Sequence, residues 1–235
     1  MEEWSLKKEY KKPKLEIGEN PIHHKAVLVA PGFEVKKIDP KENNGKLDPK
    51  KEHRTGLLWE TRIKLFAAFL LWKSGEVERV VVGGAQIREM KESFAELMKV
   101  DLINFGVPED KIDTEEYTRD TSTQVEWLQK NIKNYDNSAA FLTDPAHAKL
   151  IRELVEDYKL EEVPVLETEV IIRRLFPKVF PERDIERFES LFKKTDKSPW
   201  GIKYALREAL VTFIVKYFDD KGEYLKGKSK NRMQF

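Results

Sequence analysis

The chain has 235 residues, enough for one large domain or two small ones. It contains no cysteine, which excludes a disulfide framework, a thiolate nucleophile, an iron–sulfur cluster and a cysteine-based zinc site. Lysine and arginine (43) nearly balance aspartate and glutamate (42), and the net charge of +1 argues against a nucleic-acid-binding protein that works by bulk positive charge.

The first residues carry mixed charge and no apolar stretch, so we expect no signal peptide. The longest apolar run, residues 65–72, is far shorter than the roughly 20 residues that a membrane span needs. These features predict a soluble, cytoplasmic protein.

Short apolar runs alternate with helical patterns along the chain. The runs lie at residues 26–29, 80–82, 139–142 and 163–166, with a weaker candidate at 112–115, and they are typical of strands buried on both faces. Between them, apolar residues recur at three- and four-residue spacing over residues 57–70, 94–105, 125–132 and 150–158. This order predicts a Rossmann-like three-layer α/β/α fold with a mostly parallel sheet.

No strand is expected after about residue 169. Residues 171–192 and 206–218 have helical patterns, and a basic tail follows at 226–230. We assign residues 25–167 to one Rossmann-like domain and 168–235 to a C-terminal helical extension packed on it, because no linker-like stretch separates the two.

The expected binding site follows from the fold class. Ligands of open parallel sheets bind outside the carboxyl ends of the strands, which selects the loops at 31–33, 83–86, 116–121 and 143–147. Glycine there lets a ligand approach the backbone, and each following helix offers free N–H donors. The predicted ligand-binding residues in these loops are Gly32, Gly83, Gly84, Gln86, Thr118, Arg119, Asp120, Thr121 and Thr143.

Each loop also has a structural interpretation. Taken alone, Asp120 and its neighbours favour an ordinary helix N-cap over an anion site, because Ser, Thr and Asp caps are common. The Gly83-Gly84 pair by itself indicates only a tight turn, and Gln86 either reaches a ligand or faces water. Residues 34–54, long and polar, are either a lid over the site or a disordered insertion.

His147 is the candidate catalytic residue. Asp144 as N-cap and Pro145 at the first helical position place His147 in the first helical turn, where an imidazole can donate to phosphate or act as an acid or base. A partly buried structural histidine is the alternative. His23 and His24 would point in opposite directions on a strand, so no metal site is predicted.

Taken together, five stretches of the chain resemble the YdcF/SanA/ElyC-like family of bacterial Rossmann-like domains. Four of them are the segments VLVAPG (27–32), VVVGG (80–84), GVPEDKI (106–112) with TRDT (118–121), and TDPAH (143–147). The fifth is the helix that follows the first segment, in which Arg62 matches an arginine of the family. The resemblance covers about residues 25–167. It implies a Rossmann-like fold with a pocket for a nucleotide-like ligand, to which Arg62 and Arg119 would supply charge and His147 a hydrogen bond or a proton.

One member of that family binds S-adenosylmethionine, which makes this compound the cofactor that the resemblance suggests. Other members act in envelope integrity and peptidoglycan precursor handling, and the family as a whole has no secure reaction.

This chain departs from the family pattern at several positions. Phe94 replaces a carboxylate, and Val82 replaces the serine before the glycine pair. Asp120 and Gln124 replace asparagines, and Thr123 replaces a glutamate. We therefore expect a divergent member with an altered pocket.

Three functions stay open at this point. The first is binding of a small anionic or nucleotide-like ligand, and the second is phosphoester or pyrophosphate hydrolysis with His147 as the acid–base group. The third is a non-enzymatic, envelope-related interaction module working through the C-terminal helices. That module would use Arg173, Arg174, Lys178, Arg183 and Arg187 with Phe176, Phe180, Phe188 and Phe192, unless they simply pack on the core. The sequence leaves the oligomeric state and enzymatic activity undecided.

Overall fold

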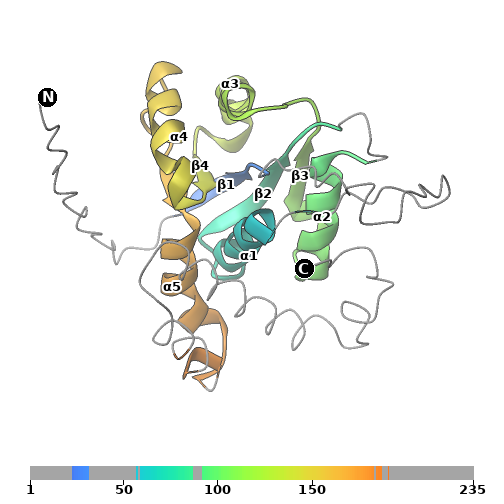
Figure 1. Ribbon diagram of the computed structural model, residues 1–235, viewed down its shortest axis with the longest axis vertical. Coiled ribbons are helices and arrows are strands. Elements are labelled where there is room, and N and C mark those ends of the chain that lie inside the picture. The colour runs from blue at the N-terminus through green and yellow to red at the C-terminus, as the bar shows by residue number, and fades with distance from the viewer. Residues whose placement is uncertain are drawn as a thin grey trace, which may run out of the picture.

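The computed structural model describes residues 23–31, 57, 59–86, 92–182, 184–186 and 190 (Figure 1). Strands and helices alternate as the sequence predicts. The strands are β1 (His24–Val29), β2 (Val77–Gly83), β3 (Ile112–Glu115), β4 (Ala139–Thr143) and β5 (Val165–Glu167). The α-helices are α1 (Trp59–Lys73), α2 (Phe94–Asn104), α3 (Thr121–Asn131), α4 (Pro145–Asp157) and α5 (Thr168–Val179), and the short 3-10 helices η2 (Glu109–Lys111) and η3 (Ile132–Tyr135) precede β3 and β4.

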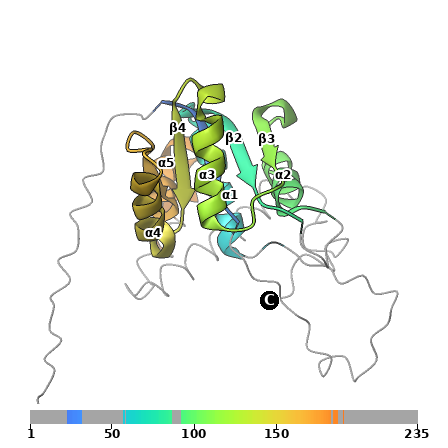
Figure 2. The ribbon, with the colours of Figure 1, turned by 90° about the horizontal axis from the view of Figure 1, so that it is seen from above.

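Within the described residues, five strands form one parallel sheet in the order β3-β2-β1-β4-β5. Helices α1, α2 and α5 cover one face and α3 and α4 cover the other, as Figures 1 and 2 show from two directions. This arrangement confirms the predicted Rossmann-like three-layer fold.

Burial on both faces explains the continuous apolar runs. In β1, Val27 and Val29 point into the core under α1, whereas Ala26 and Leu28 point into the core under α3 and α4. Successive side chains of a strand point to opposite faces, so a central strand has no solvent face that would need polar residues.

Local chemistry sets several element boundaries. Helix α3 starts at Thr121, earlier than its apolar pattern suggests, because Asp120 caps it. Strand β5 begins after Pro164. Proline has no N–H group to donate to a neighbouring strand, but the Pro164 carbonyl accepts a hydrogen bond from Phe141 N. Element boundaries thus follow capping groups and proline as well as the hydrophobic pattern.

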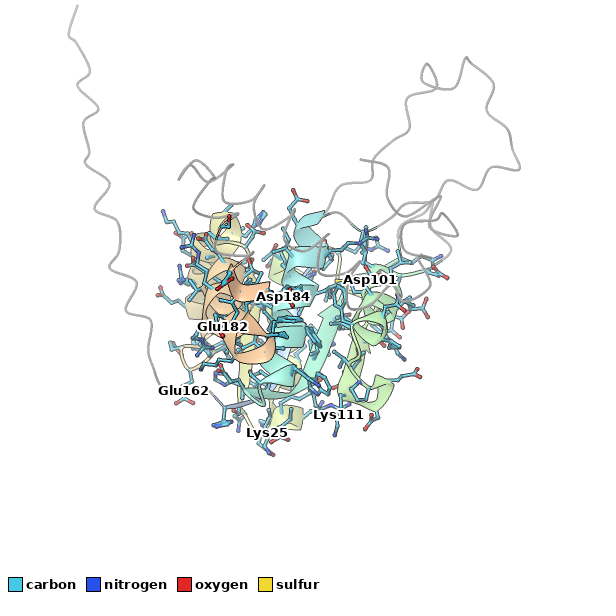
Figure 3. All side chains as sticks on the ribbon, turned by 90° about the horizontal axis from the view of Figure 1, so that it is seen from below. Lys25, Asp101, Lys111, Glu162, Glu182 and Asp184 are labelled. Carbon is cyan, nitrogen blue, oxygen red and sulfur yellow. The ribbon has the colours of Figure 1, made fainter. Side chains whose placement is uncertain are left out.

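Helix α5 belongs to the same hydrophobic core as the sheet. Leu175 and Phe176 are fully buried there, and the Phe176 ring lies near Phe66 of α1, with the ring centroids 6.4 Å apart. Figure 3, seen from below, shows α5 beside α1 on this face. Residues 34–54, 206–218 and 226–230 lie outside the described residues, so their predicted roles stay predictions.

Among the described residues, no helix has the length and apolar character needed to cross a membrane.

Candidate functional site

The strand order places the topological switch point between β1 and β4. Strand β1 leads to α1 on one face of the sheet, whereas β4 leads to α4 on the other. In open α/β sheets, ligands bind where neighbouring strands depart in opposite directions in this way. Functional side chains are therefore expected at the carboxyl ends of these two strands.

A row of small and polar residues crosses the sheet at this end. The register pairs Val29 with Val82 and with Leu142, so the next residues, Gly83, Ala30 and Thr143, are neighbours on adjacent strands. The preceding row on the same face is the large apolar set Val81, Leu28 and Phe141. On the sheet face under α3 and α4, the large apolar side chains of one row are thus followed by small residues in the last row at the carboxyl edge.

Lys64 of α1 joins the ends of β1 and β4. Its side chain is only 3% exposed, and its ammonium group donates to the Ala30 carbonyl at 3.3 Å and lies 3.2 Å from Asp144 Oδ2. Lysine is almost never buried without a partner, because desolvating an ammonium group is costly. The switch point therefore holds a desolvated cation and a carboxylate in contact.

Asp144 connects this ion pair to His147. Its side chain accepts from the backbone N–H groups of Ala146 (3.1 Å) and His147 (3.2 Å), and its Oδ2 lies 2.9 Å from His147 Nδ1. Burial by itself raises the pKa of Asp144, but the charge of Lys64 and the hydrogen bond with His147 outweigh it and hold the pKa below its ordinary value. The His147 side chain remains 56% exposed and accessible to a ligand.

The lowered pKa of Asp144 predicts an acid-sensitive contribution to stability. The folded state binds the Asp144 proton less tightly than the unfolded chain, so the contribution is complete above the ordinary value of 3.8 and disappears as the pH falls through the lower, folded value. Urea unfolding of wild type and Asp144→Asn between about pH 6 and 2 measures it, since asparagine does not titrate. The variant should lose less stability on acidification. Asp110→Asn, which removes an exposed aspartate, is the control, and parallel profiles for wild type and Asp144→Asn would contradict the prediction.

A second carboxylate lies at the end of β3. Glu115 is 2% exposed and accepts from the backbone N–H groups of Tyr117 (2.6 Å) and Thr118 (3.0 Å), as well as from the Thr118 hydroxyl. The predicted ligand residue Thr118 is therefore buried and bound to Glu115. A Cβ at Gly83 would lie 3.4 Å from Glu115 Oε2, which places this carboxylate beside the row of small residues.

Capping side chains occupy N–H groups that the sequence had suggested for a ligand. Asp120 accepts from Thr123 N at 2.8 Å and Thr123 Oγ1 returns a contact to Asp120 N, a capping box. Two of the five departures from the family pattern, Asp120 and Thr123, thus form one capping unit. Asp144 caps α4 with its side chain alone, which accepts from the N–H groups of Ala146 and His147, so the donors expected at these two helix starts are in part already used.

Two more predicted residues have structural partners. Arg62 is buried and its Nε donates to Asp101 Oδ2 of α2 at 3.2 Å (Asp101 is labelled in Figure 3). Gly84 has φ +149°, and a Cβ there would lie 2.8 Å from Phe94 Cβ. Close packing of β2 against the start of α2 therefore explains this glycine without a ligand.

The remaining predicted residues are placed as follows. Gln86 and Arg119 are exposed, Thr121 is half-buried in the first turn of α3, and Thr143 is 1% exposed at the end of β4. Gly32 lies outside the described residues. Of the predicted set, Gly83, Thr143 and His147 lie at the switch point or in the row that crosses it, and their ligand roles stay predictions.

Lys64 and Glu115 are the site residues that the sequence interpretation missed. Lys64 interrupts an otherwise apolar stretch, residues 63–71, and a lone charge in a buried helix is a signal of a paired functional group. Glu115 ends a weak strand pattern and gives no comparable signal. Among the described residues, no group of three or more His, Asp or Glu side chains is arranged to hold a metal ion.

Comparisons of the chain with protein-family models, curated proteins and solved structures find no match.

Proposed function

We propose that this protein binds a small anionic or nucleotide-like ligand, such as S-adenosylmethionine or a phosphate-containing metabolite, at the carboxyl ends of β1 and β4. The observation that carries the proposal is the buried Lys64 ammonium group between the Ala30 carbonyl and the Asp144 carboxylate. A buried ion pair adds little stability compared with apolar packing of the same volume, so its presence at the switch point favours a functional role.

The charges of the site suit this class of ligand. Lys64 and Asp144 offer one cation and one carboxylate side by side, and His147 adds a hydrogen-bonding group that is open to solvent. A ligand with both an anionic group and a hydrogen-bond donor complements such a site. The resemblance to the YdcF/SanA/ElyC-like family supports the same ligand class.

Replacing Lys64 should weaken ligand binding. Wild type is titrated with S-adenosylmethionine, AMP and inorganic phosphate, with melting temperature and calorimetry as readouts. Lys64→Met should weaken binding by about 10- to 100-fold, because a hydrogen bond to a charged group contributes about 1.5–3 kcal/mol. Lys73→Met is the matched control, since Lys73 lies on the same helix but is exposed.

His147→Ala keeps this test decisive if Lys64→Met does not fold, because the exposed His147 side chain is removed without opening the core. It too should weaken binding. The proposal fails if none of the three compounds raises the melting temperature of wild type, or if the folded Lys64 and His147 variants bind as tightly as wild type.

Hydrolysis of a phosphoester or pyrophosphate is the second candidate function. Contact between Asp144 Oδ2 and His147 Nδ1 holds the imidazole in one orientation, which is what a histidine acting as general acid or base requires. Phosphate release from AMP and ADP by the same wild-type and variant proteins, with and without Mg²⁺, distinguishes hydrolysis from binding alone. Release that His147→Ala abolishes supports hydrolysis, and no release leaves binding as the function.

A further inference from the structure

Two buried side chains near the switch point have polar atoms without a hydrogen-bond partner. Gln124 and Thr143 are each 1% exposed, and within the described part of the chain neither the Gln124 amide oxygen, its amide nitrogen nor the Thr143 hydroxyl has a partner. Buried polar groups are nearly always hydrogen-bonded, and leaving one unpaired is costly. Three unpaired atoms on two residues therefore call for a shared explanation.

Both side chains lie on the same face of the sheet. In β4, Phe141 points into the core under α3 and α4, and strand alternation sends Thr143 to that same face. On α3, Gln124 is buried one turn before Leu128, which packs in the same core. Figure 2 views the molecule from this side, with α3 and α4 over the sheet.

They also lie at the same end of the sheet. Helix α3 starts at Thr121, just after the carboxyl end of β3, so its first turns lie at the carboxyl edge of the sheet. Thr143 is the last residue of β4 at that edge. Next to it in the row are Ala30, whose side chain is one methyl group, and Gly83, which has no side chain.

We propose that the Gln124 amide and the Thr143 hydroxyl form a neutral hydrogen-bonding subsite for an uncharged donor–acceptor group of the ligand. A glutamine amide offers two donors and one acceptor, and it pairs in a bidentate way with the edge of adenine or with a primary carboxamide. This inference rests on the proposed function: Lys64, Asp144 and His147 hold the charged part, and Gln124 with Thr143 selects the uncharged part. Gln124 is therefore a specificity-determining residue.

The test compares full-length wild type with Gln124→Met and Thr143→Val, which keep the side-chain volume but remove the polar atoms. Without ligand, both variants should melt at or above the wild-type temperature, because no existing hydrogen bond is lost. Gln129→Met is the matched control on the same helix. Gln129 Nε2 donates to the Tyr158 carbonyl, so its loss should lower the melting temperature.

Binding is measured with four compounds: adenosine, purine riboside, nicotinamide and inorganic phosphate. Purine riboside differs from adenosine in that it lacks the amino group of adenine. Gln124→Met should weaken the binding of adenosine or nicotinamide at least tenfold and leave the binding of phosphate unchanged. Thr143→Ser, which keeps the hydroxyl, should restore the ligand binding that Thr143→Val loses. Preference for adenosine over both purine riboside and nicotinamide identifies an adenine edge, whereas preference for nicotinamide identifies a carboxamide.

The outcomes separate this subsite from the proposed function. If wild type binds none of these compounds, and neither S-adenosylmethionine nor AMP, the proposed function and the subsite both fail. If wild type binds and Gln124→Met binds equally well, only the subsite fails. If ligand-free Gln124→Met melts well below wild type, as is expected of Gln129→Met, a water or another part of the chain already pairs with the amide, and the subsite is overturned.

Discussion

Replacing Arg62 with methionine is expected to lower the free energy of unfolding by about 3–5 kcal/mol, because Asp101 is left buried without the cation that faces it. The two side chains are each 4% exposed, and Arg62 Nε lies 3.2 Å from Asp101 Oδ2. Folded proteins have total stabilities of only about 5–15 kcal/mol, so this single change should be prominent in urea unfolding.

The double variant Arg62→Met/Asp101→Leu is the control for this prediction. A buried ion pair replaced by apolar residues of similar volume is often neutral or stabilising, so the double variant should unfold close to wild type. A double variant no more stable than Arg62→Met would contradict the prediction. If Arg62→Met instead keeps wild-type stability but loses ligand binding, Arg62 acts on the ligand, as the family resemblance implies.

Replacing Gly84 with alanine is expected to cost about 2–5 kcal/mol, the sum of overpacking and of a backbone conformation that L-residues rarely adopt. The added Cβ would lie 2.8 Å from Phe94 Cβ and 3.0 Å from Pro31 Cγ, and φ at this position is +149°. Truncating Phe94 to alanine does not relieve the clash, because the contacted atom is the Cβ itself. Thermal and urea unfolding measure the loss.

Gly83 next door is the matched control. The three atoms nearest to a Cβ there would be Glu115 Oε2 at 3.4 Å and two atoms at 3.7 Å, which are ordinary contact distances. Gly83→Ala should therefore change stability by less than about 1 kcal/mol. Equal losses for the two variants would show that close packing around Gly84 is not what requires glycine.

Strand and helix identities were predictable because they depend on residues that are near each other in the chain. The apolar run around Val81 marks a strand buried on both faces, and the order of such runs with helical stretches between them is sufficient to predict a parallel three-layer fold. Asp144 followed by Pro145 likewise predicts the start of α4, since capping is a local interaction.

The site was only partly predictable. The rule that ligands bind at strand carboxyl ends selects the loops containing Gly83, Thr143 and His147, but it does not tell which of their residues already have partners. Asp120 and Thr118 are among the predicted ligand-binding residues, and in the folded chain Asp120 caps α3 while Thr118 bonds to Glu115. Residue type indicates what a side chain can bind, but the fold determines which groups of the chain are already its hydrogen-bond partners.

By itself, the sequence determined the elements, their order and the end of the sheet where function is expected, because hydrophobic period, capping and strand–helix alternation are encoded locally. Only the tertiary structure decided that β1 and β4 are neighbours, and hence that Lys64 meets Asp144. It also decided that Gln124 and Thr143 lie on one face without partners among the described residues. These contacts join segments that are far apart in the chain, so their presence depends on strand order and register, which no local pattern encodes.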